Sequence, residues 1–93
     1  MKPTNLLNPD FNEAYFMLGN VHFLQKDYAG AAQAYEVLLT RNQKDLKVAN
    51  NLAETYIQLG RFEQAMSLFT LITKHEPQYY NAHLRIAKCL YEL

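Results

Sequence analysis

The sequence predicts an all-α protein in which five helices form antiparallel pairs that stack on one another. Two observations indicate this fold class. The chain repeats itself with a period of 34 residues, so that Leu18 is followed by Leu52 and then Ile86. Within each period, apolar residues recur at the i, i+3, i+4 and i+7 spacing of one helix face, and the strict alternation expected of strands is absent.

The repeat becomes clear when the chain is compared with itself after a shift of 34 residues. Large apolar residues then fall on large ones, and small residues fall on small ones. The matched sets are Leu18, Leu52 and Ile86; Gly19, Ala53 and Ala87; Tyr28 and Phe62; Ala31 and Ala65; Tyr35 and Phe69; Leu38 and Ile72. Such repetition is typical of stacked helix pairs, because one pair cannot bury its apolar face alone.

The five helices are expected near 11–25, 28–41, 46–58, 62–75 and 79–93. Asp10 and Glu13 form a pair like a capping box at the start of the first helix. Asp27 stands where the second helix should begin, since its carboxylate can accept hydrogen bonds from the first turn. Lys26 occupies the turn position that is glycine in the next repeat. We therefore expect a strained turn there, at a cost of about 1 kcal/mol.

The later helices carry similar boundary signals. Asp45 stands at the expected start of the third helix. Gly60 lies where that helix ends and the chain must adopt a left-handed conformation. Pro77 ends the fourth helix and precedes the fifth. Because the turns are only two to five residues long, consecutive helices should be antiparallel neighbours.

Charge and composition exclude several classes of function. Nine basic residues balance nine acidic ones among 93, so nucleic acid is not expected as the main partner. The longest apolar run, Val37–Leu39, is far too short to insert into a membrane, and the first residues do not resemble a secretory signal. Cys89 is the only cysteine, so no intramolecular disulfide can form. These features together favour a cytoplasmic location.

The residues that repeat resemble the motif of the tetratricopeptide repeat (TPR) family. The first copy matches at Tyr15, Leu18, Gly19, Tyr28, Ala31 and Tyr35, and the second at Leu52, Ala53, Tyr56, Gly60, Phe62, Ala65, Phe69 and Pro77. The resemblance implies a single domain, residues 1–93, forming a right-handed superhelix. Its parts are a tail (1–11) similar to the end of a preceding repeat, two repeats (12–45 and 46–79), and the first helix of a third (80–93). His22, Lys26 and Gln43 depart from the motif.

The resemblance further implies a concave face lined by the first helix of each repeat. Aromatic side chains beside Asn amides at the implied positions suit a peptide groove, where apolar side chains are anchored and backbone groups are hydrogen-bonded. Packing of Phe16 and Phe23 against a neighbouring helix is the open alternative. The candidate groove residues are Phe16, Asn20, Phe23, Asn51, Arg85 and Lys88.

Some family members bind acidic carboxy-terminal peptides through a carboxylate clamp of Lys, Asn and Arg side chains. At the matching positions Asn20, Asn51 and Arg85 agree, whereas Phe16 and Asn81 replace the two lysines. The full clamp is therefore not expected, although Arg85 with Lys88 could pair with a carboxylate.

Catalysis is not expected. His22 lies at a core-packing position, which predicts a buried structural histidine. His75 and His83 lack the spacing of metal ligands, and Cys89 is expected to be a small buried apolar residue. We expect no cofactor and no metal. The leading hypothesis is a module that binds a protein or peptide partner as part of a larger scaffold, adaptor or co-chaperone-like protein.

A second hypothesis is a structural assembly module without a groove ligand. The last helix carries apolar residues on more than one side, which predicts a possible homo-oligomer formed through exposed apolar ends. RNA binding by helical repeats is a third hypothesis, and the neutral net charge argues against it.

Overall fold

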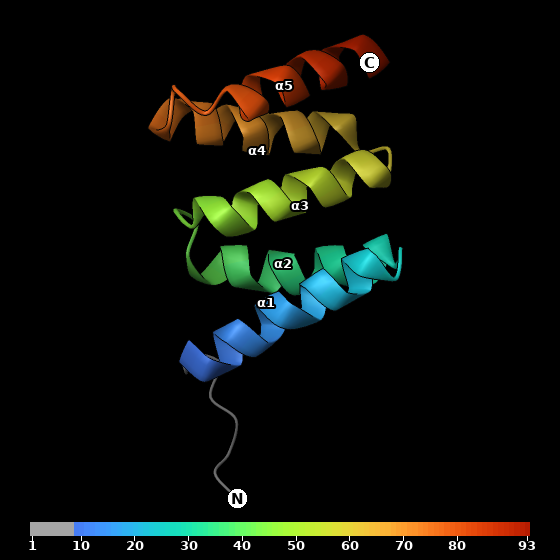
Figure 1. Cartoon of the computed structure of the whole chain (residues 1–93), viewed down its shortest axis with the longest axis vertical. Coiled ribbons are helices and arrows are strands. Elements are labelled where there is room, and N and C mark those ends of the chain that lie inside the picture. Colours follow the sequence, from blue (N-terminus) through green and yellow to red (C-terminus); the bar gives the residue numbers. More distant parts are fainter. Residues whose placement is uncertain (1–8) are drawn as a thin grey trace, which may run out of the picture.

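A computed structural model describes residues 9–93, with side chains from residue 11 onward. Within this range the chain forms five α-helices, namely α1 (Pro9–Leu24), α2 (Tyr28–Arg41), α3 (Leu46–Gln58), α4 (Phe62–His75) and α5 (Tyr80–Glu92). Figure 1 shows them stacked one above the next in chain order, with α1 and α5 at opposite ends. The described residues contain no strand, and the all-α prediction is confirmed.

The helix boundaries agree with the predicted ones to within two residues. The predicted capping by Asp10 falls on a side chain outside the described residues, as does most of the tail at 1–11. No helix of the described part is long and apolar enough to cross a membrane.

Close helix packing explains the small residues of the repeat. A Cβ atom at Gly19 would lie 2.6 Å from the ring of Tyr35, so α1 and α2 approach more closely there than any larger residue allows. In α2 and α4, Ala31 and Ala65 are fully buried. The large members of the repeat, Tyr35 and Phe69, are also buried almost completely. The core therefore follows the small and large positions that the sequence comparison identified.

The two turns inside the helix pairs have the same backbone hydrogen bonds. The amides of Lys26 and Asp27 donate to carbonyls in the last turn of α1, at 3.0 and 2.8 Å. Gly60 and Arg61 repeat these two bonds at the end of α3 with the same lengths. Both third-from-last positions require positive φ, which is 63° at Lys26 and 75° at Gly60. The strained turn predicted at Lys26 is thus observed as a left-handed residue other than glycine.

Two of the predicted helix caps are present. The Asp27 carboxylate accepts a hydrogen bond of 3.1 Å from the Gly30 amide, and that of Asp45 accepts one of 3.2 Å from Val48. Arg61, at the start of α4, makes no side-chain capping bond. These bonds fix where α2 and α3 begin, because each satisfies a first-turn amide that has no partner within its helix.

The exposed large apolar side chains lie at the two ends of the stack. Those of the first helix are Met17, Leu18, Val21 and Leu24, and those at or near the last helix are Tyr79, Tyr80, Leu84, Leu90, Tyr91 and Leu93. Helices α2, α3 and α4 have their apolar faces covered by neighbours on both sides. The apolar surface predicted for the last helix is therefore present, and α1 carries a second one.

Candidate functional site

One face of the stack is formed by α1, α3 and α5, which meet through side chains that are 31 residues apart. The Lys47 ammonium lies 4.6 Å from the centre of the Phe16 ring. The Asn51 amide donates to Asn20 at 3.3 Å, and Arg85 pairs with Glu54 at 2.7 Å. We call these three the groove pairs. Their spacing is one repeat less about one helical turn, which is the offset between successive parallel helices.

The central groove pair is fixed from below by a buried tyrosine of α2. The Tyr35 hydroxyl donates a hydrogen bond to Oδ1 of Asn20, the same atom that accepts from Asn51. Burial raises the pKa of Tyr35, and a hydrogen bond to Asn51 partly offsets this. Because the Asn20 oxygen is occupied twice, its two N–H groups are what this side chain can offer to a partner.

A groove with a volume of about 470 Å³ lies beside this amide pair. Its lining residues come from α1, α2 and α3 and are Asn20, Phe23, Leu24, Tyr35, Asn51 and Glu54. Leu24 is 81% exposed at its edge. The groove thus combines an apolar wall with amide and carboxylate groups, which is the composition of a site for a short polypeptide segment.

The two candidate aromatic residues are half-buried and serve both of the roles that the sequence left open. Phe16 packs on Tyr35, with ring centres 6.0 Å apart, and also lies under Lys47. Phe23 meets the edge of Tyr28 at 5.2 Å and lines the groove. Both contact the core from its groove side. They support the helix pair, and they leave part of their surface on the concave face.

The two candidate cations differ in their surroundings. Arg85 is held by Glu54, and its side chain is 36% exposed. Lys88 is exposed, and no ion pair to it is recorded within residues 9–93. Arg85 therefore brings a charge that is already neutralised locally, whereas Lys88 brings an ammonium that faces solvent.

A second hollow adjoins Asn51 on its other side. It has a volume of about 390 Å³ and is lined by Leu46, Lys47, Asn50, Asn51, Ile72, Glu76 and Tyr79. Oδ1 of Asn50 is buried there without a hydrogen-bond partner. The two hollows share Asn51, so they extend the candidate site along α3 from Glu54 to Lys47.

The opposite face carries a shallow hollow of about 500 Å³ over α2, α3 and α4. The Tyr56 hydroxyl donates to the Glu36 carboxylate at 2.5 Å, and the Arg61 guanidinium lies 5.9 Å from the Tyr56 ring centre. Burial, followed by the hydrogen bond and charge of Glu36, raises the pKa of Tyr56. These contacts tie the two repeats together and bring no candidate groove residue to this face.

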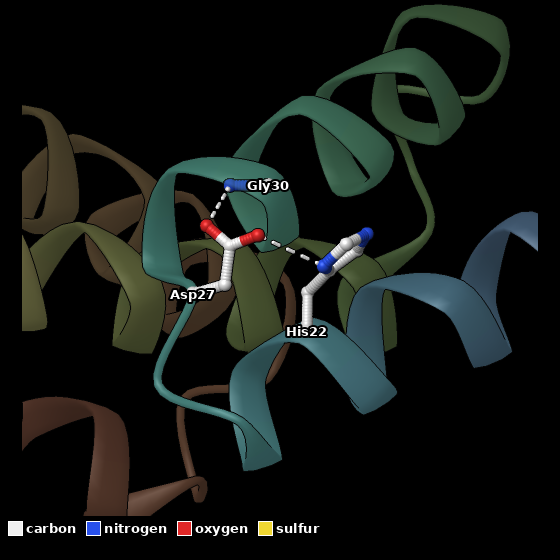
Figure 2. A network of polar contacts seen from close by, with 3 residues as sticks. All are labelled: His22, Asp27 and Gly30. Atoms are coloured by element: carbon white, nitrogen blue, oxygen red, sulfur yellow. Dashed lines mark hydrogen bonds and ion pairs between the residues drawn. The ribbon is translucent and has the colours of Figure 1, made fainter.

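His22 belongs to a local network at the first turn. Figure 2 shows the Asp27 carboxylate between the Gly30 amide and the His22 ring, whose Nδ1 lies 3.0 Å from Asp27. The His22 side chain is 30% exposed, so the prediction of a buried histidine is only partly right. A Cβ atom at Gly30 would lie 2.6 Å from Asp27 Oδ2 and 3.0 Å from His22 Nδ1. This network explains why a glycine stands inside α2.

The remaining polar groups do not assemble a catalytic or metal site in the described part of the chain. No cluster of three His, Cys, Asp or Glu residues able to hold a metal ion lies there. Cys89 is fully buried, as predicted. Burial and the nearby Glu54 carboxylate raise its pKa, so the thiol is not activated as a nucleophile.

The structure brings Asn20, Asn51 and Phe23 together around one groove, with Phe16 and Arg85 in the flanking groove pairs. Sequence reasoning did not single out Leu24, Tyr35, Glu54 or Lys47. The 31-residue spacing between parallel helices is the signal that would have paired Glu54 with Arg85 and Lys47 with Phe16.

Comparisons with known proteins agree with this architecture. A sequence model of the family described as "Tetratricopeptide repeat" matches residues 22–79. The human DnaJ homolog subfamily C member 7 is 29% identical over 77 residues, which are 83% of this chain and 16% of that protein. The U-box domain-containing protein 70 of Oryza sativa subsp. japonica is 33% identical over 70 residues, which are 75% of this chain and 9% of that protein.

A solved structure, the "TPR2B-domain:pHsp70-complex of yeast Sti1", superposes with a TM-score of 0.74. It is 23% identical, and the match covers 84% of this chain and 62% of that one. At this identity the likeness establishes the fold. The chain spans less than a fifth of the length of the two curated relatives.

Proposed function

The chain belongs to the tetratricopeptide repeat family, and from this premise we propose that its α1–α3–α5 face binds an extended segment of a partner protein. The fold is typical of protein–protein interaction modules, which are generally not catalytic. The proposal assigns this chain the same class of role, a non-enzymatic adaptor or scaffold module without cofactor. The neutral net charge argues against nucleic acid as the partner.

The observation that carries the proposal is the amide pair Asn20–Asn51 at the wall of the groove. Tyr35 and Asn51 occupy the Asn20 oxygen, so Asn20 offers N–H donors to the groove. A segment in extended conformation presents backbone carbonyls that can accept them. The apolar wall at Phe23 and Leu24 then receives a side chain of the same segment.

The charges on this face favour a segment with an acidic residue. Glu54 is neutralised by Arg85, whereas Lys47 and Lys88 are exposed. A carboxylate near an apolar residue would therefore meet an ammonium at either end of α3, without an opposing free carboxylate between them. The preference should weaken with added salt, because exposed ion pairs are screened.

The test is selection of peptides from a displayed random library on the wild-type chain, followed by measurement of affinity for variants. Truncation of both Phe23 and Arg85 to Ala should abolish binding while the helical circular dichroism remains. Phe23 also packs on Tyr28, so Leu24→Asp is the sharper variant, because Leu24 is 81% exposed and can change without loss of core packing.

Gln33→Ala is the matched control, since Gln33 is exposed on α2, which contributes only Tyr35 to the groove lining. We expect Leu24→Asp and Asn20→Ala each to weaken binding of the selected peptides about tenfold or more, and Gln33→Ala to leave it unchanged. Selected peptides that bind all of these variants equally would show that the groove is not the binding site.

A further inference from the structure

Helix α5 has an exposed apolar surface that the groove does not use. Ala82 and Cys89 are fully buried and, with Ile86, form the side of α5 that joins the core. At 3.6 residues per turn, six other residues follow one another around the helix over an arc of about 120°. In angular order these are Leu90, His83, Ala87, Tyr80, Tyr91 and Leu84. We call this set the α5 arc.

The α5 arc is large and almost purely apolar. Leu84 is 68% exposed, Leu90 59% and Tyr91 88%. The charged residues Arg85, Lys88 and Glu92 lie on the remaining sector of the helix, which faces the groove side. The α5 arc is therefore a separate surface, and its concentration on one short helix marks it as an interaction site.

The same positions serve as an interface twice elsewhere in the chain. One repeat earlier, the residues equivalent to His83, Ala87 and Leu90 are buried between α3 and α4, and two repeats earlier they face α2 from α1. They are Ala49, Ala53 and Tyr56 in α3, and Tyr15, Gly19 and His22 in α1. A small residue stands in the middle of each row, where the covering helix approaches most closely. Ala87 keeps this feature, so the α5 arc is shaped to receive a helix.

We infer that the α5 arc pairs with the α5 arc of a second copy of the chain, antiparallel, about a two-fold axis next to Ala87. Ala87 lies in the middle of the arc, and two small residues on the axis let the helices come close together. Leu84 of each copy then faces Leu90 of the other, and His83 faces Tyr91, because both pairs are centred on Ala87. A surface that is complementary to itself in this way satisfies two-fold symmetry.

The polar and charged groups are compatible with this pairing. His83 is the one residue of the α5 arc with a strongly polar side chain, and its Nε2 lies 3.0 Å from the Pro77 carbonyl of its own chain. The ring also lies 6.4 Å from that of Tyr80, centre to centre. The α5 arc carries no formal charge with neutral His83, and the net charge of the chain is zero, so two copies do not repel each other.

The first test is sedimentation equilibrium of the 93-residue chain from low micromolar to several hundred micromolar concentration. We expect a monomer–dimer equilibrium in the wild type. Leu84→Glu with Leu90→Glu should raise the dissociation constant at least about tenfold, because pairing would desolvate the new carboxylates. Both residues are exposed, so the helical circular dichroism should not change.

The matched control places the same two charges on the other apolar end, as Leu18→Glu with Val21→Glu on α1. This variant should dimerise like the wild type. A wild type that stays monomeric throughout would overturn the inference. Loss of association in the α1 variant and its retention in the α5 variant would also do so, since α1 would then be the contact.

A disulfide test fixes the symmetry. Ala87→Cys should form a covalent dimer under mild oxidation, because a residue next to the axis faces its own copy within disulfide reach. Lys88→Cys, one position away on the charged sector, should not, and the natural Cys89 is buried. Equal cross-linking of both variants would contradict the proposed axis. Peptide binding by the Glu variants of α5 reports on the groove separately, so the failure of one proposal is distinguishable from failure of the other.

Discussion

The turns of the two helix pairs have the same geometry, although they are built from different residues. Both carry a residue with positive φ, and both close with backbone hydrogen bonds of 3.0 and 2.8 Å. The first turn places Lys26 at the left-handed position and caps α2 with the Asp27 carboxylate. The second places Gly60 there and begins α4 at Arg61, which makes no side-chain cap.

Each turn thus joins one favourable choice to one unfavourable choice. A lysine in the left-handed region is strained, whereas a glycine is not. An Asp at the start of a helix satisfies a free amide, whereas an Arg does not. The neighbouring repeat position follows the same division, because His22 contacts Asp27, while the Tyr56 ring lies beside Arg61. Packing of the helix pairs dictates the turn geometry, and the local residues only adjust its stability.

The largest effect should come from Gly19, which sets the helix spacing in the first pair and is replaced by Ala53 in the second. Gly19→Val should reduce the free energy of unfolding by about 2 to 3 kcal/mol, because the new side chain would overlap the Tyr35 ring. Chemical denaturation monitored by circular dichroism measures this. Ala14→Val on the exposed side of α1 is the control and should cost less than about 1 kcal/mol.

Removal of the first cap should have the next largest effect. Asp27→Ala should destabilise the chain by about 1 kcal/mol, since the Gly30 amide loses its acceptor and His22 its partner. Arg61→Ala tests the equivalent place in the second turn, where no side-chain cap exists, and should cost about half as much or less. Equal losses in both variants would show that the cap does not distinguish the turns.

Exchange of the left-handed residues isolates the backbone part of the comparison. Lys26→Gly should raise the free energy of unfolding by about 0.5 to 1 kcal/mol, and Gly60→Lys should lower it by a similar amount. Thermal and urea denaturation of both variants provide the measurement. If Lys26→Gly is neutral or destabilising, the positive φ at that position carries no strain.

The smallest effect at neutral pH concerns the tyrosines that burial protects. The pKa values of Tyr35 and Tyr56 are raised above the ordinary value of 10.0. The folded state therefore holds these protons more tightly, so the stability is complete below pH 10 and falls as the pH rises further. Denaturation at several alkaline pH values should show this decline, and a shallower one in Tyr56→Phe. The same slope in both proteins would exclude a contribution from Tyr56.

The sequence predicted the helices and turns well because these depend on local signals that the 34-residue repeat shows twice. The strain at Lys26 followed from its alignment with Gly60, before any coordinates were considered. The side-chain partnerships were not predictable in the same way. Asn20 and Asn51 were each candidates, but Tyr35 joins them from a different helix. Arg85 was expected as a cation for a partner, and its pairing with Glu54 depends on the offset between parallel helices.

That 31-residue offset also gives a construction rule for longer arrays. Each groove pair joins a residue of one repeat to a residue of the next, so the pairs formed by an added repeat can be read from the sequence. A tandem duplicate of residues 46–79 would place Asn50 opposite the new Lys47, and Glu54 opposite the new Asn51. Both combinations can form hydrogen bonds. The chain therefore contains the parts for lengthening its own concave face, one repeat at a time, without redesign of the contacts between repeats.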